Sequence, residues 1–137
     1  MKPIFVDTSA LIAIGNKRDF FHSQAVKVRN ELKNSQRIFV TTSAILLELG
    51  NAFCSAKLRP SAIKLIEAIN HSKKWKCVIV NGVLIEQGFQ KFKQMQDKEW
   101  GLVDCISMVV TKNHGISEIF TTDNHFEQAG FNILLKH

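Results

Sequence analysis

The sequence is poor in the residues that crosslink or interrupt a chain, with three cysteines, two prolines and seven glycines among 137 residues. Cys54, Cys77 and Cys105 form no C-x-x-C pair, which argues against a disulfide framework or a thiolate zinc site and favours a reducing compartment, the cytoplasm. No apolar run reaches the roughly 18 residues of a membrane span, so we expect no membrane segment. No linker rich in Gly, Ser or Pro appears, so residues 1–137 are predicted to form a single domain.

Positive charge is in excess. Lys and Arg number 18 against 12 Asp and Glu, which gives a formal net charge of +6 and a pI near 9.4. A basic surface favours a polyanionic partner such as nucleic acid, although charge by itself identifies no partner.

Short β-branched and aromatic runs alternate with segments of helical periodicity. The runs at 4–6, 38–42 and 119–120 each stop at hydroxyl or carboxylate residues, as buried parallel strands do when they end at a polar edge. Strands separated by helices predict an α/β fold, a three-layer sandwich around a mostly parallel sheet. Further strands are expected at 77–80 and 132–135, and helices at 20–33, 44–56, 61–72, 84–95 and 102–113.

The segment 44–56 is apolar on all sides, which predicts a deeply packed helix. The short stretch 58–60, which contains Pro60, is expected to join it to the next helix as an antiparallel pair.

Three carboxylates, Asp7, Glu48 and Asp104, stand alone in apolar segments. An ionised carboxylate in such a setting costs several kcal/mol unless it is paired or bound to metal, so each needs a partner. Simpler roles are open: Asp7 and Asp123 could cap helices, Asp104 could complement a helix N-terminus, and Glu48 could pair with a buried Arg. The nearest charged residues along the chain are Lys2 and Lys17 for Asp7, Arg37 and Lys57 for Glu48, and Glu99 and Lys112 for Asp104.

The expected topology brings these acids together. Asp7 and Asp123 follow predicted strands, and ligands bind at the carboxyl ends of strands in open α/β sheets. Converging carboxylates repel one another and need a counter-cation, and oxygen ligands favour Mg²⁺ or Mn²⁺. The histidines show no H-x-x-x-H spacing, so we expect them at the surface or in structural roles: His22, His71, His114, His125 and His137.

Asp104 also starts a narrow polar stripe on its predicted helix. Ser107 and Thr111 follow it at i+3 and i+7, within an otherwise apolar segment. Residues at this spacing share one helix face, and we predict that this face lines a wet cavity.

The ordered set of motifs resembles the PIN-domain ribonucleases, especially the VapC-type toxins of bacterial toxin–antitoxin pairs. The motifs are V-D-T-S-A at 6–10, L-E-L-G-N-A at 47–52, L-V-D-C-I-S at 102–107 and T-T-D-N-H-F at 121–126. The resemblance implies a Mg²⁺- or Mn²⁺-dependent endoribonuclease that leaves 5′-phosphate and 3′-hydroxyl ends. It also implies a homodimer inhibited by a small antitoxin protein.

The resemblance assigns roles by position. It makes Asp7, Glu48, Asp104 and Asp123 the catalytic, metal-binding quartet, with Ser9 and Thr121 as supporting hydroxyls. Ser107 on the polar stripe is expected to support the site as well, and Asp97 and Glu99 are either supporting or merely solvated. The chain departs from the family at Asn124-His125, where a basic residue is common, which bears on substrate contact and leaves the metal site unaffected.

Three other functions were compared with this one. A receiver-type signalling module also places acids at strand ends, but it needs a second acid beside Asp7, where Val6 stands, and a Lys after a late strand. A haloacid-dehalogenase-type phosphatase needs D-x-D, whereas Asp7-Thr8-Ser9 lacks the second acid. A PIN fold that binds RNA or a partner without cutting is the third possibility, and the presence of all four acids argues against it.

Overall fold

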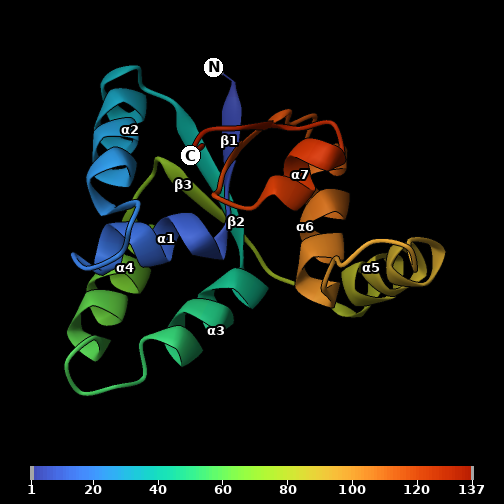
Figure 1. Ribbon diagram of the computed structural model, residues 1–137, viewed down its shortest axis with the longest axis horizontal. Coiled ribbons are helices and arrows are strands. Elements are labelled where there is room, and N and C mark those ends of the chain that lie inside the picture. Colours follow the sequence, from blue (N-terminus) through green and yellow to red (C-terminus); the bar gives the residue numbers. More distant parts are fainter. Residues whose placement is uncertain (1, 137) are drawn as a thin grey trace.

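A five-stranded sheet lies between two helical layers in the computed structural model, which describes residues 2–136 (Figure 1). The strand order is β3-β2-β1-β4-β5, and each of the four pairings is parallel. The predicted α/β sandwich is therefore confirmed. The strands are β1 (Pro3–Val6), β2 (Ile38–Thr42), β3 (Trp75–Val78), β4 (Glu118–Phe120) and β5 (Asn132–Ile133).

Helices cover both faces of this sheet. Figure 1 shows α1, α2 and α4 on one side and α6 and α7 on the other, with α5 packed outside α6. Coverage on both faces explains why Ile4, Phe5 and Val6 of the central strand are fully buried and why the strands are apolar rather than alternating. The helices are α1 (Thr8–Gly15), α2 (His22–Asn34), α3 (Ser43–Ala52), α4 (Arg59–His71), α5 (Gly82–Gln94), α6 (Leu102–Asn113) and α7 (Asn124–Gln128).

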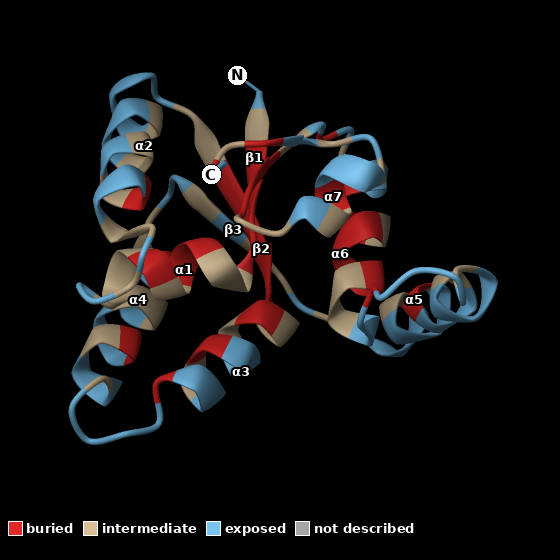
Figure 2. Ribbon diagram, viewed as in Figure 1, coloured by how far each residue is buried: buried red, intermediate tan, exposed pale blue. Residues whose placement is uncertain are grey.

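Helix α3 differs from its prediction. It ends at Ala52 and buries only a narrow stripe that includes Ile45 and Leu49, while Leu47 is 72% exposed (Figure 2). The expectation of a deeply packed helix was wrong because α3 extends away from the carboxyl end of β2 and has no second layer over its outer face. Helix α4 begins at Arg59, so Pro60 lies within the first helical turn and not in the connection.

Helices α5 and α6 approach closely at Gly88. A Cβ atom at this position would lie 2.5 Å from the Cγ1 atom of Ile106, so only glycine permits the contact without a shift. The close packing fixes α6, the helix that carries Asp104. None of the helices within residues 2–136 has the length and hydropathy needed to cross a bilayer.

The sheet has a topological switch point between β1 and β4. From β1 the chain adds β2 and β3 on one side, then returns to add β4 and β5 on the other. The crevice at the carboxyl ends of the strands on either side of such a reversal is the usual ligand site of open α/β sheets.

Candidate metal centre at the switch point

Asp7 lies in this crevice. Val6 and Phe120 are paired across β1 and β4, and the Asp7 N–H donates to the Phe120 carbonyl at 3.0 Å, which extends the pairing by one residue. The side chain of Asp7 occupies the N-cap position of α1, yet it makes no capping hydrogen bond within the described residues. Only 6% of Asp7 is exposed, and helix capping therefore does not explain why this carboxylate is buried.

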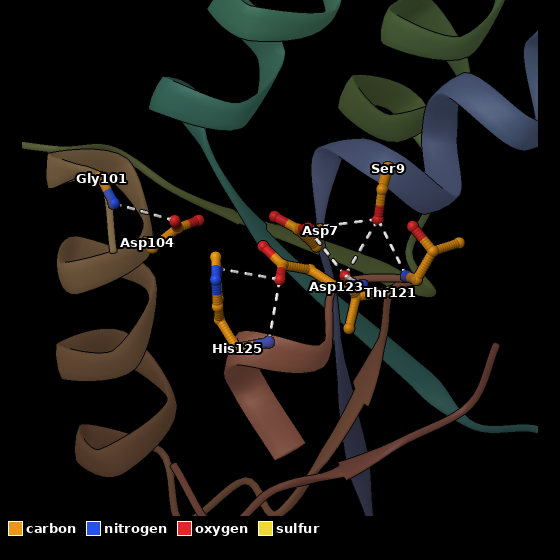
Figure 3. A network of polar contacts seen from close by, with 8 residues as sticks. Asp7, Ser9, Gly101, Asp104, Thr121, Asp123 and His125 are labelled. Carbon is orange, nitrogen blue, oxygen red and sulfur yellow. Dashed lines mark hydrogen bonds and ion pairs between the residues drawn. The ribbon is translucent and has the colours of Figure 1, made fainter. Parts of the chain in front are cut away.

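Two hydroxyl groups hold the Asp7 carboxylate (Figure 3). Thr121 Oγ1 donates to Asp7 Oδ2 at 2.9 Å and accepts the N–H of Asp123 at 3.0 Å. Ser9 Oγ lies 3.3 Å from the same Asp7 oxygen and 2.9 Å from Thr121 Oγ1, and it accepts the N–H of Thr122. The ends of β1 and β4 are thus tied together around one buried carboxylate.

The environment of Asp7 opposes its ionisation. Burial raises the pKa of the Asp7 carboxyl from 3.8 to about 6, the hydrogen bond from Thr121 works against this rise, and the nearby charges of Asp104 and Asp123 add to it. A carboxylate that is buried beside two other acids is stabilised in its charged form by a cation.

Asp123 and His125 form the next part of the site. Asp123 caps α7, because its Oδ1 accepts the N–H of His125 at 2.9 Å, so the capping role considered for this residue is real. The Nδ1 atom of His125 lies 3.1 Å from the same oxygen (Figure 3).

Asp104 approaches from α6 on the opposite side of the crevice. Its Oδ2 accepts the N–H of Gly101 at 3.0 Å, which satisfies the start of the helix. Burial raises the pKa of the Asp104 carboxyl, the Gly101 hydrogen bond lowers it, and the charges of Asp123 and Glu48 raise it further. Asp104 therefore also has a structural role in addition to its place in the acidic cluster.

Glu48 completes the set, but it is not buried. It is exposed on α3, and its Oε1 accepts a hydrogen bond from Thr8 Oγ1 at 2.6 Å. The prediction that Glu48 sits in an apolar environment was wrong, because the outer face of α3 is open. Its charge still acts on Asp104, which places it near the other acids.

Ser107 does not join the network. It is fully buried, and within residues 2–136 its Oγ atom has no hydrogen-bond partner. This part of the predicted polar stripe is therefore enclosed in the interior and not open to solvent. Asp97 is solvated, with a side-chain exposure of 75% and a loose contact of 3.7 Å to Lys98.

The donor set suits a divalent cation. One ligand atom each from Asp104, Asp123 and His125 lies within 4.8 Å of the other two, and the buried Asp7 carboxylate faces the same cluster (Figure 3). Hard oxygen donors of this kind match Mg²⁺ or Mn²⁺. The histidines were expected at the surface or in structural roles, and His125 is the one that the structure places in this group. The D-x-H spacing after a strand was the signal that could have pointed to it.

Comparisons with known proteins agree with this arrangement. Residues 4–132 match the family described as PIN domain. The 23S rRNA-specific endonuclease VapC20 of Mycobacterium tuberculosis is 29% identical over 133 residues, covering 93% of this chain and 95% of that protein. The crystal structure of the same VapC20, described as a sarcin-ricin loop cleaving toxin, superposes with a TM-score of 0.81 over 93% of this chain and 95% of that one, at 28% identity.

A more distant structure shares the fold. FitAcB from Neisseria gonorrhoeae superposes with a TM-score of 0.67 at 14% identity, covering 96% of both chains. A receiver-type module is excluded by these matches.

Proposed function

Because the chain belongs to the PIN domain family, we propose that it is a divalent-metal-dependent endoribonuclease and the toxin of a type II toxin–antitoxin pair. The observation that carries the proposal is the convergence of Asp7, Glu48, Asp104 and Asp123 at the switch point, with Asp7 buried and its pKa raised to about 6. Residues 1–137 act as one nuclease domain, and we place its action in the cytoplasm, where RNA is available.

The substrate is a structured RNA. VapC20 is named for cleavage of 23S rRNA and for the sarcin-ricin loop, and its similarity extends over nearly the whole of both chains. The net charge of +6 favours binding of a phosphate backbone. A large-subunit ribosomal RNA hairpin is therefore the first substrate to test.

The four acidic residues have two tasks in this proposal. Asp7, Asp104 and Asp123 hold the cation, and Glu48 adds negative charge from the open side. When bound, the cation supplies Lewis acidity for the attack of water on a phosphodiester. Thr121 and Ser9 orient the Asp7 carboxylate by hydrogen bonds, so that its charge points into the crevice without rearrangement.

The first prediction tests the activity itself. We expect the protein to cut a sarcin-ricin-loop oligonucleotide when Mn²⁺ or Mg²⁺ is present, to leave 5′-phosphate ends, and to lose all cleavage in EDTA, since the carboxylates alone provide no electrophile. Product length and end chemistry are read on a sequencing gel. RNA binding without cleavage at any metal concentration would favour the alternative of a non-cutting PIN-fold RNA-binding protein.

A homodimer is the proposed assembly. Leu47 is 72% exposed on α3, and Ile79 and Val83 are 70% and 65% exposed between β3 and the start of α5. The Val80 N–H donates to Ser43 Oγ at 2.9 Å, and Ser43 lies one helical turn before Leu47, so the segment that leads into α5 lies close to the start of α3. We take Leu47, Ile79 and Val83 as the dimer surface. Self-association through a two-fold axis would bury this surface on both protomers.

The second prediction tests this assembly. The double substitution Leu47→Asp and Val83→Asp is expected to weaken dimerisation by about 100-fold or more, because each dimer would bury four unpaired carboxylates. Sedimentation velocity at micromolar concentrations measures the change. Phe20→Asp, which alters an 83% exposed side chain elsewhere, serves as the control and should leave the dimer intact, while a wild type that is monomeric contradicts the assembly.

Besides a second copy of the chain, the proposed protein partner is a small antitoxin. An acidic crevice is blocked most directly by a cation, so an inhibitory segment would insert an Arg or Lys among the four acids and cover the surrounding apolar surface. Inhibition that survives removal of every basic residue in that segment would contradict this mode of binding.

A further inference from the structure

The side chain of His125 contacts Asp123 without a hydrogen bond from its ring. Within the described residues its Nδ1 atom is buried and makes no hydrogen bond, although it lies only 3.1 Å from Asp123 Oδ1. That oxygen already accepts the backbone N–H of the same His125. If Nδ1 carries the lone pair of a neutral imidazole, the carboxylate oxygen repels it, so the short distance requires a proton on one of the two atoms or a cation that both of them bind.

The separation of these two atoms matches that of neighbouring ligands of one ion. Two adjacent donors of an octahedral ion, with bonds of about 2.1 Å, lie about 3.0 Å apart, and two opposite donors lie about 4.2 Å apart. His125 Nδ1 and Asp123 Oδ1 are 3.1 Å apart, and the group that they form with Asp104 has no separation above 4.8 Å. The three residues are thus already arranged at distances close to those of a ligand set.

We propose that His125 Nδ1 is a ligand of the metal ion, beside Asp123 and Asp104, and that this nitrogen makes the site prefer Mn²⁺ to Mg²⁺. The inference rests on the metal site of the proposed function and adds a residue outside the acidic quartet. Imidazole binds transition-metal ions more readily than Mg²⁺, which favours carboxylate, carbonyl and water oxygens. A site made only of carboxylates lacks this basis for discrimination.

The alternative role for His125 is to orient Asp123 as a protonated partner. An imidazolium ion at this position would repel a divalent cation and would bind neither Mn²⁺ nor Mg²⁺. Substitution of a protonated His125 would then change the affinities for Mn²⁺ and Mg²⁺ by the same factor. The two roles therefore differ in a measurable way.

The substitution His125→Asn separates these roles. The amide oxygen of Asn can take the place of Nδ1, so the variant keeps a donor atom at the site but exchanges nitrogen for oxygen. His71→Asn is the matched control, because His71 is exposed and its Nδ1 is bonded to the Glu67 carbonyl one turn earlier in α4. The measurements use the full chain with Mn²⁺ or Mg²⁺ as the added ion and no RNA.

Pulsed electron paramagnetic resonance of bound Mn²⁺ reports nitrogen ligation directly. We expect ¹⁴N coupling in the wild type and in His71→Asn, and its loss in His125→Asn. Calorimetric titration with each ion should show that the preference for Mn²⁺ over Mg²⁺ falls about tenfold or more in His125→Asn only. Absence of ¹⁴N coupling in Mn²⁺-loaded wild type, its persistence in His125→Asn, or an equal loss of affinity for both ions overturns the proposal.

These outcomes are independent of the nuclease assay. Wild type that cuts RNA but shows no nitrogen coupling refutes the His125 ligand and leaves the proposed function intact. Wild type that binds Mn²⁺ through nitrogen but cuts no RNA refutes the proposed function and supports the ligand.

Discussion

Asp7→Asn is expected to abolish RNA cleavage while the protein stays folded. Asn preserves the shape of the side chain and an oxygen that accepts the Thr121 hydrogen bond, which is 2.9 Å long in the wild type, but it removes the negative charge. Loss of several kcal/mol of transition-state stabilisation lowers the rate by about 10³-fold or more. Single-turnover cleavage of the RNA oligonucleotide at saturating Mn²⁺ measures this, and circular dichroism checks the fold.

Asp97→Asn is the matched control for this experiment. It removes the same charge from a solvated side chain whose ion pair with Lys98 is loose at 3.7 Å, so cleavage should remain within about twofold of wild type. Full activity in Asp7→Asn would remove this residue from the site, and equal losses in both variants would point to a general effect of net charge on RNA binding.

The fold was predictable because its signals are local and repeated. The β-branched runs that became β1, β2 and β4 are short and end at polar residues, and the helix at Leu102–Asn113 was predicted to the residue. Helices α1 and α7 were not predicted as elements, because α1 begins directly after β1 and α7 has only five residues. Both helices are too short for the spacing of their apolar residues to show a clear helical period.

The sequence was sufficient to predict which acidic residues come together, but not how buried each one is or which groups surround it. Chain order and topology were sufficient to bring Asp7, Asp104 and Asp123 to one sheet edge. The exposure of Glu48 depends on how far α3 extends past the sheet, and the proximity of His125 to Asp123 depends on a turn of two residues. Both are set by tertiary geometry, which isolated charges in a sequence do not encode.

The raised pKa of Asp7 leads to the last prediction, which concerns stability without metal. Folding raises the pKa of this carboxyl from 3.8 to about 6. Each unit of pKa difference between the folded and unfolded states corresponds to ~1.4 kcal/mol, so ionised Asp7 destabilises the fold by roughly 3 kcal/mol. Because the folded state holds the proton more tightly, this loss is complete above pH 6, shrinks as the pH falls, and disappears below about pH 4.

Asp7→Asn, which cannot ionise, should therefore be more stable than wild type at pH 7.5 in EDTA, by up to about 3 kcal/mol. Urea unfolding at pH 7.5, 6 and 5 measures the difference between the two proteins, which should narrow steadily toward low pH. Asp104 also has a raised pKa, but its contribution is common to both proteins and largely cancels. Adding Mn²⁺ at pH 7.5 should reverse the order, since the ion stabilises only the protein that binds it. A difference that does not change with pH would show that Asp7 ionises in the folded protein as easily as in the unfolded chain, and that its burial carries no electrostatic cost for the cation to relieve.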